Sequence, residues 1–325
     1  MASIAYITDR QMIEFHRLNG NQTISFWRPS VGKRFADFNH GDLLFFLAKG
    51  TELKTTGEKG IIGYGRFDHS IGYSFRQMWN HFESLNGYPD QKSFKDAILR
   101  VAKAKTLPVN ISSLILKDIV FFQAPVYLSE FGMKISNNLE SFIYLDKDDP
   151  EMTVKILMKA NDIGVDAWAN AMSRSSRSSS VFDDDLARHI LQLQLQNLGA
   201  LSTEKETRKQ TRILNEVLKS GSGLQWLDVR KQELIAFVDE GIELYFSIDC
   251  NKNQIMERVV HSFGKFSLIR KLADEIPNFD QKISFKLLID HELPDNLLSL
   301  FKLDDVEIIS HHQHDDLNVT ESDDI

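Results

Sequence analysis

Three stretches, TISFWRPS (residues 23–30), GDLLFFLAKG (41–50) and GIIGYGRF (60–67), decide the fold of the first half of this 325-residue chain. Each is rich in β-branched and aromatic residues and is bounded by Gly, Pro, Asn or Asp, which is typical of short β-strands. SLILKDIVFFQ (113–123) and SFIYLD (141–146) have the same character. Five such strands in succession favour a small barrel or a strongly curved sheet.

Two helices are predicted between the third and fourth of these strands. SFRQMWNHFESLNG (74–87) repeats apolar residues at helical spacing, begins at a serine that can cap a helix and ends at a glycine. SFKDAILRVAKA (93–104) predicts the second helix, with Ser93 as its cap. We therefore expect an α+β N-terminal domain, a β-barrel with helices.

The composition changes at MSRSSRSSSVFDDD (172–185). Because Ser and Arg do not bury apolar surface, this stretch predicts an exposed linker, with a surface loop inside one domain as the alternative. The linker would separate an N-terminal domain, residues 1–171, from a C-terminal domain, residues 186–311. The acidic residues 312–325 predict a disordered tail.

Beyond the linker the pattern predicts an α/β domain. Residues 184–198 and 205–220 repeat apolar positions every three or four residues, as amphipathic helices do. ELIAFVD (233–239) and IELYFSID (242–249) predict a hairpin. The chain then continues as helix, strand, helix and strand, and a strand–helix–strand ending is typical of an α/β domain.

The composition is that of an ordinary globular protein, with 42% hydrophobic and 26% charged residues. No run of about eighteen apolar residues and no signal-peptide pattern is visible, so we expect a cytoplasmic protein with no membrane association. The single cysteine, Cys250, excludes an internal disulfide and a cysteine-rich zinc site. A lone thiol also suits a reducing compartment.

The net charge of −8 is unevenly distributed along the chain. Residues 1–134 carry 17 Lys and Arg against 12 Asp and Glu, a net +5. Residues 173–325 carry 18 against 27, a net −9. The basic half is compatible with contacts to phosphate and equally with a protein–protein module.

The order of motifs in the first half resembles a known domain. Four motifs in order resemble the EVE-like domain of the PUA-like superfamily. They are FWRPS (26–30), the strand Gly41–Lys49, GYGRF (63–67) and a W-x-x-F helix that ends in Asn-Gly. Type IV, modification-dependent restriction systems fuse this domain to HNH nucleases. ESFIYLD (140–146) resembles the end of the same module. The resemblance implies that about 150 residues receive a flipped, modified base, typically a methylated or hydroxymethylated cytosine in DNA.

A site for a flipped base requires aromatic planes, cations for phosphate and polar groups for the base edge. Trp27 and Tyr64, on neighbouring predicted strands, would form the walls. The alternative for Trp27 is a place in the core, and the alternative for Tyr64 is a solvated face of its strand. Ser30 and Asn39 would bind the base edge. Two glycines beside Tyr64 would leave room for a ligand to approach the backbone. The expected phosphate-binding residues are Arg28, Lys33, Arg34 and Arg66. No cofactor is required for such binding.

Tyr64 is also a departure from the family, whose third strand often has a glycine at this position. The larger side chain would narrow the pocket or change the modification that is recognised.

The C-terminal half lacks the His and Asn set of an HNH nuclease, but its element order resembles a restriction-endonuclease-like, PD-(D/E)xK fold. The resemblance implies Glu233 and Asp249 as carboxylates for Mg²⁺. Asn251 stands where the family has its lysine, with Lys252 adjacent. Because a neutral amide cannot stabilise developing negative charge as an ammonium does, we expect a degenerate core that serves as a scaffold or docking surface.

The sequence therefore predicts a sensor of modified nucleic acid in bacterial anti-phage defence, with modified DNA as the expected ligand. Its C-terminal domain would act as an effector, or would dock an effector protein or a second copy of the chain. One alternative is a modification-dependent endonuclease, which would require Mg²⁺. The other is an RNA-binding PUA-like module. The sequence leaves open whether the protein is an enzyme.

Overall fold

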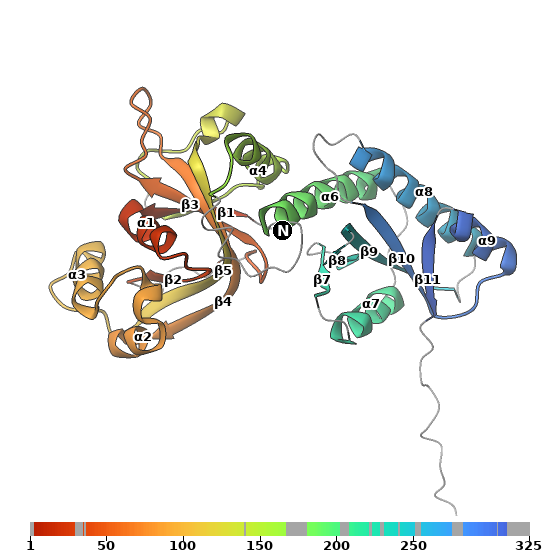
Figure 1. Cartoon of the computed structure of the whole chain (residues 1–325), viewed down its shortest axis with the longest axis horizontal. Helices are drawn as coiled ribbons and strands as arrows, with labels where there is room; N and C mark the ends of the chain where they lie inside the picture. The colour runs from red at the N-terminus through yellow and green to blue at the C-terminus, as the bar shows by residue number, and fades with distance from the viewer. Residues whose placement is uncertain are drawn as a thin grey trace, which may run out of the picture. The chain divides into compact units, whose positions relative to one another are not determined.

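The computed structural model describes residues 3–29, 35, 37–139, 141–166, 181–201, 208–220, 223–227, 231–239, 241–250, 255–274, 282–303 and 305–310. The chain divides into two compact units, Met1–Leu186 and Ala187–Ile325, whose elements are labelled in Figure 1. Within the described ranges, none of the helices has the length and apolar character needed to cross a membrane.

The first unit is built on a six-stranded mixed sheet with the strand order β2-β5-β4-β3-β1-β6. The strands are β1 (Ile4–Asp9), β2 (Thr23–Arg28), β3 (Leu43–Lys49), β4 (Gly60–Tyr73), β5 (Ile111–Val126) and β6 (Phe142–Tyr144). β1 runs parallel to β3, and the other neighbours are antiparallel. The register of β4 against β5 shifts three times, and such bulges bend a sheet strongly. The predicted α+β class is confirmed.

Helices cover this sheet and fill the connection between β4 and β5. They are α1 (Arg10–Leu18), α2 (Phe75–Phe82), η1 (Glu83–Asn86), α3 (Gln91–Ala102), η2 (Leu128–Phe131) and α4 (Met152–Ile163). The predicted cap of α2 is confirmed, because Ser74 and Gln77 form a reciprocal capping box. The predicted cap of α3 is wrong: Asp90 begins the helix, and its carboxylate accepts a hydrogen bond from the Ser93 backbone N–H at 2.8 Å.

The two faces of this sheet belong to two separate hydrophobic clusters. Neighbouring residues on a strand point to opposite faces, so Phe46 joins one cluster and Phe45 joins the other. The first cluster, which we call the α3-side core, contains Trp27 and Phe94. The second, the α4-side core, contains Tyr64 together with residues of α4.

The predicted linker is wrong at its C-terminal end. Residues 181–185 form the first turn of α6 (Val181–Leu201) rather than an exposed connection. Phe182 is only 1% exposed and belongs to the α4-side core. Its aromatic ring gives this turn enough apolar surface to pack within the first unit. The acidic composition of the stretch does not indicate this packing. Residues 172–180 lie outside the described ranges.

The second unit contains a five-stranded sheet with the order β11-β10-β9-β8-β7. Its elements are α7 (Arg208–Ser220), β7 (Gln225–Trp226), β8 (Leu234–Val238), β9 (Gly241–Ile248), α8 (Ile255–Asp274), β10 (Ile283–Ile289), α9 (Asp295–Leu303) and β11 (Val306–Ser310). β8 and β9 form the predicted antiparallel hairpin. β9, β10 and β11 are parallel, with α8 and α9 as the crossover helices. Residues 312–325, the predicted tail, lie outside the described ranges.

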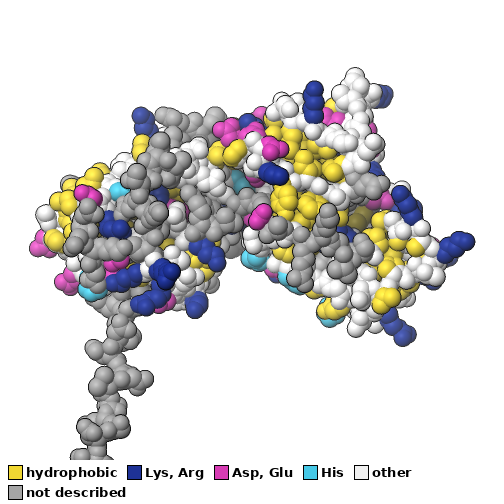
Figure 2. Space-filling model, turned by 180° about the vertical axis from the view of Figure 1, so that it is seen from behind, with side chains coloured by type: hydrophobic (Ala, Val, Ile, Leu, Met, Phe, Trp, Pro, Cys, Tyr) yellow, Lys and Arg dark blue, Asp and Glu magenta, His cyan; other side chains and the backbone are white. Residues whose placement is uncertain are grey.

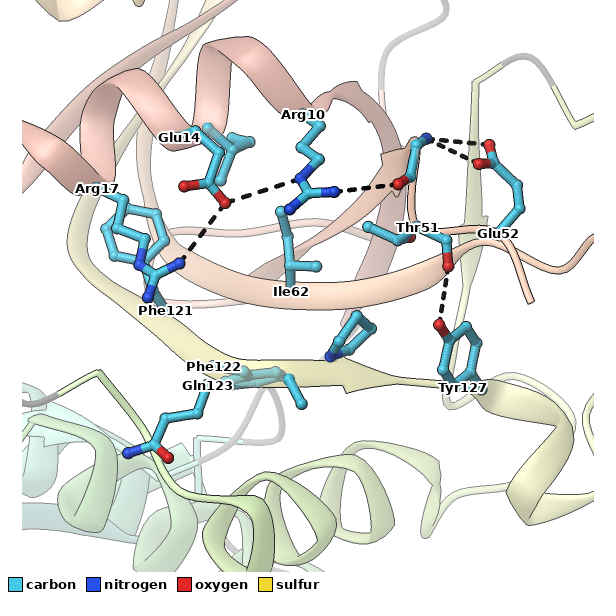
Figure 3. Close-up of a pocket in the computed structure, with 14 residues that line it drawn as sticks. Arg10, Glu14, Arg17, Thr51, Glu52, Ile62, Phe121, Phe122, Gln123 and Tyr127 are labelled. Atoms are coloured by element: carbon cyan, nitrogen blue, oxygen red, sulfur yellow. Dashed lines mark hydrogen bonds and ion pairs between the residues drawn. The ribbon is translucent and has the colours of Figure 1, made fainter. Parts of the chain in front are cut away.

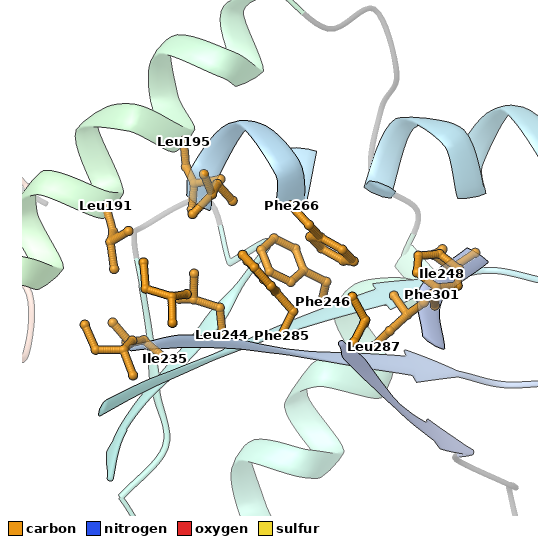
Figure 4. Packing of buried hydrophobic residues seen from close by; sticks show 14 of the residues in the cluster. Leu191, Leu195, Ile235, Leu244, Phe246, Ile248, Phe266, Phe285, Leu287 and Phe301 are labelled. Atoms are coloured by element: carbon orange, nitrogen blue, oxygen red, sulfur yellow. The ribbon is translucent and has the colours of Figure 1, made fainter. Parts of the chain in front are cut away.

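Helices cover both faces of this second sheet. α6, α8 and α9 supply apolar side chains to one cluster, in which Phe266 stacks on Phe285 with ring centroids 4.7 Å apart. Figure 4 shows Phe246 beside these two rings, and Leu191 and Leu195 of α6 above the sheet. α7 covers the opposite face and packs against residues of β8 and β10.

Candidate functional site

Trp27 is a core residue and does not form the wall of a base-binding pocket. The residue is 7% exposed, and its indole Nε1–H donates to the backbone oxygen of Asn86 at 3.0 Å. Its ring meets that of Phe94 edge-on, with centroids 5.5 Å apart. A satisfied N–H inside an aromatic cluster is the usual arrangement of a buried tryptophan.

Tyr64 is buried as well, on the other side of the sheet. β5 separates β2 from β4, so the strands that carry Trp27 and Tyr64 are not neighbours. Because the two rings also belong to different cores, the predicted pair of pocket walls is wrong. The Tyr64 hydroxyl donates to the Asp185 carboxylate at 2.8 Å. Burial, and then the charge of Asp185, raise the pKa of Tyr64 well above its ordinary value, so the hydroxyl stays protonated.

Arg66 completes this network instead of standing on a phosphate-binding surface. Its guanidinium contacts Asp185 at 2.9 Å and Asp118 at 3.1 Å. Burial lowers the pKa of Arg66, but the charges of the two carboxylates outweigh that effect and hold the pKa above its ordinary value. With two carboxylates already bound, Arg66 is a structural ion-pair residue.

The glycines beside Tyr64 make room for β5 and not for a ligand. A Cβ atom at Gly63 would lie 2.3 Å from the backbone oxygen of Val120. One at Gly65 would lie 2.6 Å from a methyl group of Ile119. Another group does approach these glycines closely, as expected, but it belongs to the neighbouring strand β5 and not to a ligand.

Of the remaining predicted residues of the N-terminal site, the structure describes Arg28 and Asn39. The Arg28 guanidinium lies over the rings of Phe35 and Tyr6, 5.0 and 5.8 Å from their centroids. Asn39 is exposed in the turn before β3, and its backbone N–H donates to Asp42 at 2.7 Å. Three further predicted residues lie outside the described ranges: Ser30, Lys33 and Arg34.

In the second unit, lysines contact the predicted catalytic carboxylates. Glu233 is 1% exposed and is paired with Lys265 of α8. The ammonium of Lys209 lies 3.9 Å from Asp249 and also pairs with Asp290. Lys252 lies outside the described ranges. Among the residues that the structure describes, no three His, Cys, Asp or Glu side chains are grouped to hold a metal ion.

Asp290 is bound by a backbone N–H as well as by Lys209. The backbone N–H of Cys250 donates to it at 2.9 Å. Its burial favours the neutral acid, but the hydrogen bonds from Lys209 and Cys250 outweigh that effect and lower the pKa of Asp290 to about 2. Asp249 and Asp290 follow adjacent parallel strands, which explains why residues distant in sequence meet here.

A pocket of about 260 Å³ lies in the first unit between α1 and β5, and we call it the α1–β5 pocket. Figure 3 shows its lining residues. They are Arg10, Ile13, Glu14 and Arg17 from α1, residues 50–52 after β3, Ile62 from β4, residues 121–125 from β5, and Tyr127.

The wall formed by β5 is a bulge. Gly63 pairs with Phe121 and Ile61 pairs with Val126, so Ile62 alone on β4 faces four residues, 122–125, on β5. Pro125 has no N–H to donate to a sheet ladder, which favours a bulge at this point. The backbone of the bulge thus turns away from regular pairing and lines the pocket.

Charged side chains of α1 stand at the rim of the pocket. Glu14 lies between two arginines, 3.9 Å from Arg10 and 3.6 Å from Arg17. Arg10 also donates to the Gly50 backbone oxygen at 3.2 Å, and Arg17 donates to Asp166 at 2.5 Å. Arg10 is the more exposed of the two arginine side chains, at 55% against 37%. The pocket therefore combines a few partly exposed apolar side chains with one carboxylate and two guanidinium groups.

Sequence reasoning did not identify this pocket, although two signals for it exist. Arg10, Glu14 and Arg17 are spaced by four and three residues, which places them on one face of a helix. Pro125 interrupts a run that otherwise reads as a strand, which predicts an irregularity. The partners that complete the site come from distant segments, and no local pattern indicates them.

Comparison with known proteins yields only remote similarity. No family model and no curated protein matches the chain. Among solved structures, ASCH from Zymomonas mobilis is 10% identical, with a TM-score of 0.35, over 47% of this chain and 94% of that chain. A Tyr-to-Phe variant of that protein matches at 10% identity and a TM-score of 0.34, over 47% and 97% of the two chains. A Ser-to-Ala variant matches at 9% identity and a TM-score of 0.34, over 47% and 94%.

Proposed function

We propose that the first unit binds nucleic acid and receives one extruded base in the α1–β5 pocket. The observation that carries the proposal is the pocket itself: about 260 Å³ of space with a charged rim in the basic half of the chain. Sites for drug-sized ligands occupy roughly 300–1,000 Å³, so this pocket suits a smaller group such as a single base.

The groups around the pocket match what an extruded base requires. Ile62 and Pro125, which are partly exposed, offer apolar contact to the base faces, replacing part of the stacking that is lost when a base leaves the duplex. Glu14 can accept a hydrogen bond from an exocyclic amino group, which is how acidic side chains recognise cytosine. Gln123 supplies a further polar side chain at the pocket wall. These contacts favour a cytosine-type base with its amino group directed at α1.

Phosphate would lie at the Gly50 end of the pocket. There Asp9, the N-cap of α1, is bound by Arg100 at 3.2 Å and stands opposite Lys49 in the register of β1 and β3. The exposed side chains of Arg10, Lys49 and Arg100 would supply the cations for phosphate there. Arg17, at the other end, is held by Asp166 and Glu14. Figure 2 shows Lys and Arg side chains on the described surface of the molecule.

The ligand that we favour is DNA with a modified cytosine, read by a sensor in anti-phage defence. The resemblance of the first half to EVE-like domains supports this choice, and RNA is the alternative. A binding assay distinguishes the two. Fluorescence anisotropy would compare cytosine-containing duplexes that are unmodified, methylated, hydroxymethylated or glucosylated with RNA of the same sequence. Tighter binding of one modified duplex supports the sensor, and preference for RNA supports the alternative.

Variants of the rim test the pocket assignment. Arg10→Ala is expected to weaken binding roughly tenfold at moderate salt, because an exposed phosphate contact is lost. Glu14→Gln should reduce discrimination between bases. Arg76→Ala is the matched control, since Arg76 is exposed on α2 and does not line the pocket. Equal losses for Arg10→Ala and Arg76→Ala would show that binding depends on overall charge and not on this pocket.

For the second unit we propose a docking or effector role without nuclease activity. The support is that Lys265 and Lys209 contact the carboxylates that would have to bind Mg²⁺. We expect no Mg²⁺- or Mn²⁺-dependent cleavage of modified DNA by the purified chain. Cleavage that is abolished by Glu233→Ala or Asp249→Ala would instead establish the endonuclease alternative.

A further inference from the structure

α8 carries apolar residues on two opposite faces. Val259, Phe266 and Ile269 on its inner face are completely buried against the sheet. On the outer face, Met256, Val260 and Leu268 are exposed by 49%, 57% and 46%. A helix that is apolar on both faces is usually covered on both. The outer face of α8 is therefore a candidate interaction surface.

Gly264 lies at the centre of this outer face. Met256, Val260, Gly264 and Leu268 follow one another at intervals of four residues, which forms a single ridge along a helix. A glycine inside a helix costs about 1 kcal/mol relative to alanine. No contact among the described residues requires it, because a Cβ atom at this position would meet none of their atoms within 4 Å. The close approach of a second helix would explain its presence.

The charges on this face are arranged symmetrically about the same glycine. Glu257 precedes Gly264 by seven residues and Lys271 follows it by seven, so all three share one face of the helix. Both charged residues are exposed. Val260 and Leu268 are likewise four residues to either side. The face is thus complementary to itself under a two-fold rotation, which is the property of an isologous dimer interface.

We propose that two copies of this chain associate through antiparallel α8 helices that cross at Gly264. In this arrangement Glu257 of each copy faces Lys271 of the other, and Val260 faces Leu268. The absence of a side chain at the crossing point allows the two helices to approach closely. The surface is one helix face, so the dimer is weak and depends on concentration. This inference does not depend on the binding activity proposed for the first unit.

Sedimentation velocity of the full chain over a wide concentration range tests the proposal. The wild-type chain should show a monomer–dimer equilibrium. Gly264→Leu should raise the dissociation constant by roughly tenfold or more while leaving the melting temperature unchanged or higher, because leucine favours the helix and has open space around it. A variant that melts at the wild-type temperature and still dimerises would overturn the proposal, as would a wild-type chain that is monomeric throughout.

Charge exchange provides the second test. Glu257→Lys and Lys271→Glu should each weaken self-association, because each places like charges opposite one another in both pairs. A mixture of the two single variants should associate, since every pair across the interface is then of opposite charge. The double variant should associate like the wild type. Failure of both the mixture and the double variant to recover association would exclude antiparallel pairing at Gly264.

Discussion

Asp185 shows how a single carboxylate can determine the role of two other residues. It accepts a hydrogen bond from Tyr64 and pairs with Arg66, which makes both residues structural. Asp118, the second partner of Arg66, has a side chain that is 45% exposed, whereas that of Asp185 is completely buried. The two carboxylates should therefore differ in their contribution to stability.

Replacing Asp185 should destabilise the first unit much more than replacing Asp118. Asp185→Asn leaves the Arg66 charge poorly compensated in a buried site, and we expect a loss of about 3 kcal/mol in the free energy of unfolding. Asp118→Asn removes an exposed partner and should cost less than about 1 kcal/mol. Urea denaturation of the full-length chain measures both. Similar losses for the two variants would mean that Asp185 is not the main partner of Arg66.

His16 should make the first unit sensitive to acid. Its side chain is completely buried, and this burial lowers its pKa from 6.5 to about 3. The unfolded chain binds the proton more readily than the folded chain does. Stability is therefore complete above pH 6.5 and falls as the pH decreases toward 3. Between pH 7 and pH 5 the expected loss is about 2 kcal/mol.

Comparison with a variant that does not titrate isolates this effect. His16→Gln keeps a polar side chain without a titrating ring, so its free energy of unfolding should change less between pH 7 and pH 5. Urea denaturation at the two pH values measures the difference. Parallel losses in the wild type and the variant would assign the acid sensitivity to other groups.

At the scale of elements, β4 depends on the absence of a side chain at one glycine. Gly63 has a φ of +153°, and a Cβ atom there would collide with the Val120 backbone oxygen. Gly63→Ala should therefore lower the stability of the first unit by about 2 kcal/mol or more. Gly72, on the same strand, has open space around it, and Gly72→Ala should change stability by less than about 1 kcal/mol. Thermal unfolding that fails to separate the two variants would contradict the observed packing of β4 on β5.

α1 shows why an element can be overlooked as part of a site. It is short, and its sequence reads as an ordinary amphipathic helix with charges on its exposed face. The bulge of β5 and the segment around Asp166 convert that face into one wall of a pocket. The charges on the helix follow from its own sequence. Whether they line a pocket depends on the segments that pack opposite the helix.

At the scale of the whole molecule, the boundary between the two units falls inside α6, after Leu186. A fragment that ends at residue 171 would lose Phe182 and Asp185, whereas one that ends at residue 190 would keep both. We expect the shorter fragment to melt about 10 °C lower, because losing a buried phenylalanine alone costs roughly 3–5 kcal/mol. Differential scanning calorimetry of the two fragments measures this. Equal melting temperatures would support the boundary at residue 171 that the sequence predicts.

Local pattern alone was sufficient for β2 to β6, the cap at Ser74, the hairpin of β8 and β9 and the α+β class of the first half, but not for β1 or β7. These features depend on residues that are close together in the sequence, such as turn residues, caps and side-chain periodicity. The charges of the α1–β5 pocket were also visible, as a stripe of Arg10, Glu14 and Arg17 on one helix face.

Only the tertiary structure decided which aromatic and charged residues are available to a ligand. Trp27 and Tyr64 have the aromatic rings that a base-binding pair needs. Each face of the sheet, however, is covered by segments from elsewhere in the chain. α3 closes one face. α4 and the turn that begins α6 close the other, and Asp185 in that turn neutralises Arg66. A side chain is exposed or buried according to the segments that fold over it, and those segments lie up to about 120 residues away.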